Sequence, residues 1–314
     1  MKILFTSVGR RVELIQAFKN AAERLKIELI IYGADITSSA PALQFCDERV
    51  IVPRINDEQY ILKLKEICQE EQIDALIPTI DTDLMILAQN KKNFGKTTVV
   101  ISEKDKIAIC RDKRFTADYF NSVGLKSPHP VDNWREYHGG YPAFIKPKDG
   151  SSSVFAYKVT DEEELKMLSE QVPDYIIQPF IEGTEYTIDI FCDFCGEPIF
   201  ITPRIRLAVR AGEVLKTEIK QDSQIINEMK LLVKDYKPCG QITVQMIRES
   251  TTGDDYYIEI NPRFGGGAPL TMKAGADSAE MLLRLIRGEE IKYQEKAAED
   301  GAVFSRFDQS IRVK

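Results

Sequence analysis

Short apolar strands alternate with amphipathic helices over the first hundred residues, and this alternation limits the possible folds more than any other feature. Strands are predicted at residues 2–7, 28–34, 50–52, 74–78 and 97–101, with helices at about 12–25, 58–70 and 84–92. Strands that are joined through helices pair in parallel. The pattern therefore predicts a doubly wound parallel sheet of the α/β class. Its ligand edge is expected at the loops after the strands, which are 7–11, Asp35 and 79–83.

Beyond residue 111 the regular alternation ends. A helix containing Phe115 and Phe120 leads into a proline-rich connector, and strands are predicted at 141–146, 154–159 and 175–180. Long antiparallel strands follow, with helices near 222–236 and 277–287 and an edge strand at 303–313. We therefore expect three units, at residues 1–110, 111–180 and 181–314.

Composition limits the partners of the chain. It has 314 residues and a formal net charge of −7. We expect no nucleic-acid partner, because sequence-independent binding to nucleic acid needs clustered basic charge. No apolar run approaches the roughly 20 residues that a membrane helix needs, and residues 1–7 do not resemble a signal peptide. A cytoplasmic protein without a membrane partner is the expectation.

Histidine and cysteine chemistry is disfavoured by the same sequence. The chain has only two histidines, His129 and His138, and six scattered cysteines. The single C-x-x-C pair, Cys192 and Cys195, lacks the second pair that a zinc site would need, so a strand end and a turn are the favoured interpretation. Acid–base chemistry would fall to carboxylates, lysines or bound phosphate.

A predicted hairpin near the end of the chain carries the most informative side chains. Its strands are 241–248 and 256–260. A turn centred near Thr252 puts Gln245 opposite Glu259, and Asn261 shares the face of Glu259 because strand side chains alternate. Oxygen atoms converging on one patch suit Mg²⁺, which is usually held by one or two carboxylates together with substrate phosphates. The alternative is a polar strand face exposed to solvent.

The residues after this hairpin favour an anion site beside the metal. Arg263 is followed by the glycine loop, Gly265-Gly266-Gly267. Glycines allow the backbone to approach an anion closely. Arg263 can neutralise a phosphate or a developing oxyanion.

Two lysines indicate further phosphate contacts. Lys113 opens a helix, and Lys146 ends an apolar strand before the small-residue loop 149–153. This loop is not a Walker A motif, because the chain has no G-x-x-x-x-G-K-[ST]. A lysine at the end of a buried strand needs an anion, although each lysine alone is also compatible with a surface charge.

Residues 178–185 link two strands and suit a nucleotide base. Pro179 cannot donate to a strand ladder, so pairing is interrupted there. Free backbone groups beside Phe180 suit an adenine ring, and Glu185 suits ribose hydroxyls. Without this context the segment is a simple strand junction.

Taken in this order, the motifs resemble the ATP-grasp superfamily, most closely its carbamoyl-phosphate-synthetase-like branch. The resemblance covers residues 1 to about 290 and is most specific at Gln245 and Glu259-Ile260-Asn261-Pro262-Arg263. It implies a pre-ATP-grasp, Rossmann-like first domain. An α+β ATP-grasp fold should follow, with a lid loop in the 111–180 unit, a metal site in the 181–314 unit, and antiparallel sheets that clasp ATP.

The resemblance also implies a role for each motif residue. Nucleotide phosphates would be bound by Lys113, Lys146, Ser151 and Ser152. Adenine would meet the backbone of Gln178 and Phe180, with Glu185 on the ribose. Mg²⁺, as one ion or two and with Mn²⁺ as a substitute, would be bound by Gln245, Glu259 and Asn261. The catalytic residues would be Arg263, Lys146 and Arg206, with Arg206 ranked ahead of Arg204 and Arg210 as a ligand of phosphate or carboxylate.

The implied reaction joins a small-molecule carboxylate to an amine or a thiol. ATP phosphorylates the carboxylate, and attack on the acyl phosphate releases phosphate. Arg10, Asp81 and Asp83 lie on the predicted loop edge and are candidate substrate ligands, the two aspartates for an ammonium group. Helix capping is the alternative role for the aspartates.

Two other functions stay open. A non-catalytic nucleotide-binding or regulatory module would keep the fold, although the presence of Lys113, Lys146, Glu259 and Asn261 argues against it. An enzyme that only phosphorylates bicarbonate or another carboxylate is the other alternative. The chain departs from its relatives in its serine-rich lid loop and in Gln245, an uncharged residue where other branches carry an acidic ligand. A homodimer is compatible with the sequence.

Overall fold

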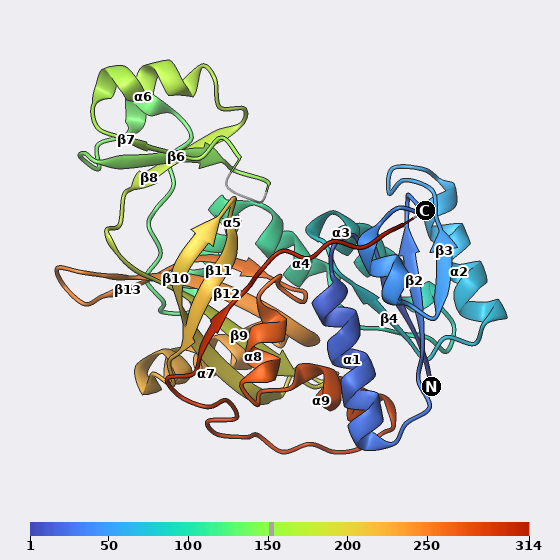
Figure 1. Cartoon of the computed structure of the whole chain (residues 1–314). Helices are drawn as coiled ribbons and strands as arrows, with labels where there is room; N and C mark the ends of the chain where they lie inside the picture. The colour runs from blue at the N-terminus through green and yellow to red at the C-terminus, as the bar shows by residue number, and fades with distance from the viewer. Residues whose placement is uncertain (151–153, 314) are drawn as a thin grey trace.

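The computed structural model describes residues 1–150 and 154–313. Within these ranges the strands form three sheets, which helices cover (Figure 1). The predicted fold class is confirmed, since a parallel sheet at the N-terminus is followed by antiparallel sheets. No helix in the described ranges is both long and apolar enough to cross a membrane.

The first sheet is parallel and has the strand order β3-β2-β1-β4-β5. Its strands are β1 (Lys2–Thr6), β2 (Ile30–Asp35), β3 (Glu48–Ile51), β4 (Ala75–Pro78) and β5 (Thr98–Val99). The strands β2 and β3 follow each other on one side of β1, and β4 and β5 lie on its other side. The order therefore reverses between β1 and β4, and the loops after these two strands border the crevice where open α/β sheets bind ligands.

Helices cover both faces of this sheet. On one face lie α1 (Val12–Leu25) and the 3₁₀ turn η1 (Pro41–Phe45), and on the other lie α2 (Gln59–Glu70), α3 (Asp81–Asn90) and the turn η2 (Lys91–Asn93). The ring of Phe18 in α1 packs edge-on against Phe5, with centroids 5.0 Å apart, and against Phe264, at 5.8 Å. The first sheet therefore shares a hydrophobic core with the chain segment that follows β13.

The largest sheet is antiparallel and has the order β13-β12-β9-β10-β11-β14. Its strands are β9 (Gly183–Cys192), β10 (Pro198–Arg210), β11 (Glu213–Ile219), β12 (Gly240–Glu249), β13 (Asp255–Asn261) and β14 (Val303–Ser305). One face packs on α5 (Lys113–Ser122) and α7 (Ser223–Tyr236). On the other side, α8 (Ala268–Lys273) and α9 (Ser278–Ile286) fill the space between this sheet and α1.

An ion pair is buried in the middle of this sheet. Arg204 Nε donates to Asp189 Oδ2 at 2.8 Å, and their side chains are 2% and 1% exposed. Hydroxyl groups of Thr243 and Thr271 donate to the same carboxylate. A methyl group added to Gly267 would lie 2.6 Å from Arg204 Nη2. The ion pair therefore packs closely against the glycine loop.

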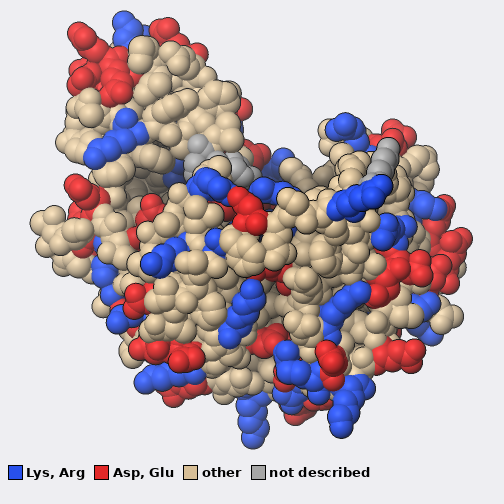
Figure 2. Space-filling model, viewed as in Figure 1, with Lys and Arg blue, Asp and Glu red and all other residues tan. Residues whose placement is uncertain are grey.

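A separate lobe contains the third sheet. It consists of β6 (Ala143–Pro147), β7 (Tyr157–Val159), β8 (Tyr175–Pro179), α6 (Glu162–Ser169) and the turn η3 (Trp134–Glu136), with a small hydrophobic core of its own. Figure 1 shows it projecting from the rest of the molecule, and in Figure 2 the surface is hollowed between this lobe and the first domain. The helices α4 (Lys104–Arg111) and α5 connect the first domain to the lobe.

Three elements differ from the sequence-based expectations. The helices α4 and α8 were not predicted, because both are short and α8 follows three glycines. Helix α3 begins at Asp81 rather than Leu84. The strand expected at 303–313 pairs only over Val303–Ser305, since the chain beyond it turns to ion pairs of Arg306 and Asp308. The division into units at 1–110, 111–180 and 181–314 stays a prediction.

Candidate active site

The hairpin of β12 and β13 positions three oxygen-bearing side chains as the sequence predicted. Gln245 pairs with Glu259 and Thr243 with Asn261, and a bulge follows Gln245. The predicted register is therefore confirmed up to that bulge. Asn261 is buried and its amide donates a hydrogen bond to Glu259 Oε1. The three side chains offer carboxylate and amide oxygens, which are the donors that Mg²⁺ prefers.

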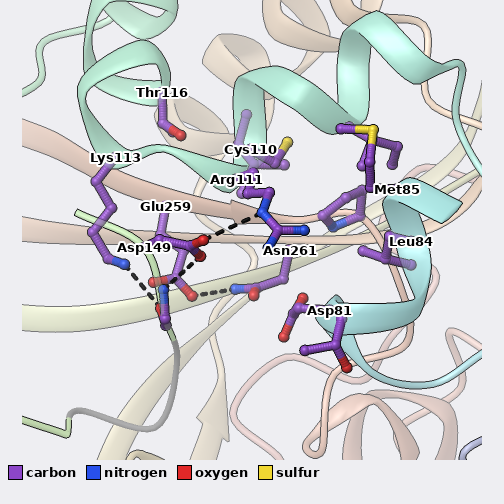
Figure 3. A pocket seen from close by; sticks show the side chains of 15 residues that line it. Asp81, Leu84, Met85, Cys110, Arg111, Lys113, Thr116, Asp149, Glu259 and Asn261 are labelled. Atoms are coloured by element: carbon purple, nitrogen blue, oxygen red, sulfur yellow. Dashed lines mark hydrogen bonds and ion pairs between the residues drawn. The ribbon is translucent and has the colours of Figure 1, made fainter. Parts of the chain in front are cut away.

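A pocket opens beside this hairpin, and Figure 3 shows its lining. The first domain contributes Asp81 from the start of α3, and β13 contributes Glu259 and Asn261. Lys113 comes from the first turn of α5 and Asp149 from the chain just before the lid loop. The structure thus gathers residues from all three predicted units around one cavity.

Lys146 is a buried cation at the end of β6. Its side chain is 9% exposed, and its Nζ lies 5.7 Å from the ring centroid of Phe144. Burial and, to a smaller extent, the positive charge of Lys113 lower its pKa to about 8, against the opposing effect of Glu259. The single negative charge of Glu259 does not balance the two positive charges of Lys146 and Lys113. An additional anion between them would stabilise the charged form.

The side chain of Lys113 forms a hydrogen bond with the backbone of the lid loop. Its Nζ donates to the Gly150 carbonyl oxygen at 2.9 Å, and Arg111 pairs with Asp149 at 3.2 Å. Lys113 is correctly predicted to open a helix, since Asp112 is the N-cap residue. The predicted phosphate ligands Ser151 and Ser152 lie outside the described residues.

The predicted adenine segment joins the lobe to the large sheet. Gln178 is buried in β8, and its Nε2 donates to the Pro128 carbonyl oxygen at 2.6 Å. Phe180 follows β8 and its ring lies 4.1 Å from Lys158 Nζ. Glu185, near the start of β9, is 54% exposed and pairs with Arg206 at 3.1 Å.

The three arginines on β10 have different surroundings. Arg206 is 8% exposed and also donates to the Gly212 carbonyl oxygen at 3.1 Å, beside its pair with Glu185. Burial lowers its pKa. Arg204 is committed to Asp189, and Arg210 is 62% exposed and pairs with Asp308. Of the three, Arg206 alone pairs with a predicted nucleotide ligand, and its catalytic role stays a prediction.

Arg263 forms an ion pair with a residue of the first domain. Its Nη2 pairs with Asp81 Oδ2 at 2.5 Å and also donates to Asn261 Oδ1 at 3.2 Å. Its Nε is buried and has no hydrogen-bond partner among the described residues. A buried N–H group without a partner is costly, so this atom is available to a ligand oxygen.

The two aspartates of α3 have separate roles. Helix capping is the wrong interpretation, because the N-cap residue is Ile80 and no side chain caps the helix. Asp83 is fully buried and accepts hydrogen bonds from the Thr6 and Ser7 hydroxyl groups at 2.8 Å, and burial raises its pKa. It thereby supports the loop after β1, whereas Asp81 faces the pocket. Arg10, the third candidate substrate residue, is exposed on that loop.

Sequence reasoning did not single out Arg11, Glu213 or Arg306. These residues come from distant parts of the chain and meet beside the glycine loop. Adjacent Arg10 and Arg11 at the end of a predicted strand were the available signal for the first of them. No local pattern marks the other two.

Comparisons with known proteins match this architecture. A PylC-like N-terminal domain model matches residues 3–101, and an ATP-grasp domain model matches residues 110–267. The 3-methyl-D-ornithine–L-lysine ligase of Methanosarcina acetivorans is 25% identical over 91% of this chain and 75% of its own length. The D-alanine–D-alanine ligase B of Clostridium perfringens is 24% identical over 81% of this chain and 93% of its own.

A solved structure has the same fold. The biotin carboxylase domain of Hydrogenobacter thermophilus 2-oxoglutarate carboxylase superposes with a TM-score of 0.76. The match covers 96% of this chain and 73% of that one, at 17% sequence identity. That structure is a dimer in complex with MgADP, ADP and bicarbonate.

Proposed function

This chain belongs to the ATP-grasp family, and from that premise we propose that it is an ATP-dependent, ADP-forming ligase. It would activate a small-molecule carboxylate as an acyl phosphate and join it to an amine. Two of its relatives are ligases named for pairs of amino acids, which supports this reaction class. The observation that carries the proposal is the buried Lys146, whose charge an anion bound near Glu259 would stabilise.

The described residues fit Mg-ATP. Lys146 and Lys113 would bind the phosphates, since their charges exceed that of Glu259. Glu259, Asn261 and Gln245 would hold Mg²⁺, whose charge, when bound, neutralises the phosphate oxygens. Mn²⁺ is expected to substitute for it.

The nucleoside would bind where the lobe joins the large sheet. The backbone of Gln178 and Phe180 would meet adenine, and the exposed Glu185 would accept hydrogen bonds from the ribose. Arg206 would hold Glu185 in place through their ion pair. The lid loop with Ser151 and Ser152 would complete the phosphate site.

The chain's own groups account for the remaining chemistry. The carboxylate attacks the γ-phosphorus, and the lysines stabilise the charge on the transferred group and on the departing ADP. Arg263 would donate from its Nε, which has no hydrogen-bond partner among the described residues, to the acyl phosphate and to the tetrahedral oxyanion. The amine then attacks the carbonyl carbon and loses a proton, and phosphate leaves, which gives the amide.

The decisive experiment measures ADP release with Mg-ATP against amino acids, other carboxylates and bicarbonate, each with and without an amine. Stimulation by one carboxylate and one amine, with an amide in the product and no activity in Glu259→Ala, is the expected result. ADP release with bicarbonate alone would favour the phosphorylating enzyme instead. Tight ATP binding without turnover in any mixture would favour the regulatory module.

A further inference from the structure

Three charged side chains meet behind the glycine loop, and we refer to Arg11, Glu213 and Arg306 as the arginine cluster. Arg11 follows β1, Glu213 begins β11, and Arg306 directly follows β14. Arg306 Nη1 donates to Glu213 Oε2 at 2.8 Å, and Arg11 Nη1 lies 3.7 Å from Glu213 Oε1. Two guanidinium groups from opposite ends of the chain therefore hold one carboxylate.

The cluster adjoins the candidate active site. A methyl group added to Gly266 would lie 2.6 Å from Glu213 Oε2 and 2.8 Å from Arg11 Nη1. Gly266 belongs to the same loop as Arg263. Arg11 Nη2 also donates to the Thr79 carbonyl oxygen at 3.4 Å, at the loop edge after β4. The cluster is thus placed beside the groups that would activate the carboxylate.

Charged groups of both signs act on the arginine cluster. Burial lowers the pKa of Arg11, and the positive charges of Arg263 and Arg306 lower it further, against the opposing effects of Glu213 and Asp81. Burial raises the pKa of Glu213, yet the hydrogen bond from Arg306 and the charges of Arg11 and Arg10 lower it overall. Glu213 and Asp81 oppose these arginines, and Arg306 Nε also lies 3.5 Å from Glu13 Oε2. A substrate anion would therefore have to replace a carboxylate of the cluster rather than be added to it.

Glu213 has the properties of a replaceable ligand. Its side chain is 36% exposed, and it lies just after the β10–β11 turn, whose residues Ala211 and Gly212 have positive φ angles of 48° and 77°. The arginines are more deeply placed, at 19% and 25% exposure. A substrate anion that reached the cluster would displace the more accessible carboxylate and leave the two arginines in place.

We propose that Arg11 and Arg306 bind a second anionic group of the substrate, separate from the carboxyl group that is activated, and that Glu213 occupies their place until the substrate binds. The inference rests on the proposed ligase function and specifies its substrate class. The substrate is an acid that carries an additional carboxylate or phosphate. Both sources offer oxygens that match a guanidinium fork.

A permanent clamp is the competing explanation. In that case the cluster would only hold the segment after β14 against the first domain, and Glu213 would be required for stability. The two explanations predict opposite effects of Glu213→Gln. If Glu213 competes with the substrate, removal of its charge lets the substrate bind more tightly. If the cluster is a clamp, the same substitution weakens both folding and binding.

The test compares acids that differ only in the second anion: glutamate against norvaline, and phosphoserine against serine. ADP release is measured for the wild type, Arg306→Gln, Glu213→Gln and the control Arg284→Gln, whose pair with Glu289 is similarly exposed but belongs to α9. We expect Arg306→Gln to raise KM for the preferred dianionic acid by about 10- to 100-fold, the value of a charge-assisted hydrogen bond. Glu213→Gln should lower that KM, and the control should change neither.

Several results would overturn the inference. One is that norvaline is used as well as glutamate, or serine as well as phosphoserine, and that Arg306→Gln changes KM equally for both acids of the pair. This result would leave the ligase function intact. Another is a higher KM together with a lower melting temperature in Glu213→Gln. If no acid stimulates ADP release, the ligase proposal fails, and calorimetric titration with glutamate and phosphoserine then decides the anion site. Binding that Arg306→Gln weakens would support it, and no binding of either would refute it.

Discussion

Arg263 and Asp81 form an ion pair at 2.5 Å that joins the chain after β13 to the first turn of α3. The Arg263 side chain is 11% exposed and that of Asp81 is 36% exposed. A guanidinium has limited freedom when one end is held by a carboxylate. This pair therefore orients the Nε of Arg263, which lacks a hydrogen-bond partner within residues 1–150 and 154–313. We therefore propose that Asp81 is a positioning residue, which the first domain supplies to a site in the large sheet.

Asp81→Asn is expected to lower kcat by about 10- to 100-fold, because a small misplacement of an oriented group has effects of this size. The KM for ATP should change little. Steady-state kinetics with ATP and amine varied separately would measure both. Asp132→Asn, which breaks the exposed pair with Arg114, is the control. A selective rise in KM for the amine would instead identify Asp81 as an ammonium ligand.

Glu259→Gln should abolish most turnover, since it removes the only carboxylate among the three proposed metal ligands. We expect ADP release to fall by about 100-fold or more and the Mg²⁺ concentration for half-maximal rate to rise. Chelation with EDTA should stop the wild type, and Mg²⁺ or Mn²⁺ should restore it. Glu249→Gln, near the turn of the same hairpin, should behave as wild type. Unchanged Mg²⁺ dependence in Glu259→Gln would place the metal elsewhere.

The pKa of about 8 at Lys146 predicts a pH dependence of ATP use. The side chain is charged below this pH and neutral above it, so kcat/KM for ATP should fall as the pH rises through 8. A profile of kcat/KM from pH 6 to 10 would show this limb, and Lys146→Arg should remove it, because a guanidinium stays charged. A flat profile in the wild type would exclude Lys146 as a phosphate ligand.

The same lysine should lower the stability of the protein without nucleotide. Its pKa in the folded state is below the ordinary value of 10.5, so its cost is greatest below pH 8 and vanishes as the pH rises toward 10.5. Lys146→Met should therefore raise the free energy of unfolding at pH 7 by about 3 kcal/mol while ATP turnover is lost. Urea unfolding at pH 7 and pH 10 would measure the difference. If Lys146→Met were less stable than the wild type, the charge of Lys146 would have to be compensated in the folded state.

Arg204→Met should destabilise the fold strongly. It leaves the buried Asp189 without its cation, and breaking such a pair costs about 3–5 kcal/mol. Urea unfolding measures the change. Lys63→Met removes an exposed pair with Glu66 and should shift the free energy of unfolding by less than about 1 kcal/mol. Equal effects of the two variants would contradict this account of the buried pair.

The parts of the site that the sequence predicted are local in the chain. Gln245 and Glu259 belong to one hairpin, so a turn position and the alternation of side chains were sufficient for their register. Lys113 and Lys146 were identified by their positions at a helix start and at a strand end. In each case the evidence lay within a few residues of the side chain.

The unpredicted parts depend on packing between distant segments. Asp83 has the sequence context of a cap, yet its carboxylate bonds to Thr6 and Ser7, more than seventy residues earlier. Residues 303–313 alternate like a strand, but only Val303–Ser305 of this segment pair with β11, and Arg306 then forms an ion pair with Glu213. Periodicity cannot indicate which charged partner a side chain will find across the molecule.

The buried ammonium group of Lys146 also has a chemical consequence. An amine with a pKa near 8 is partly neutral in mildly alkaline buffer, where an ordinary lysine is almost fully protonated and unreactive. Small acylating reagents that enter the site should therefore react with this lysine, and a nucleotide should protect it. Lysine-directed covalent probes would then report the occupancy of the site in a cell extract, before any substrate of the protein is known.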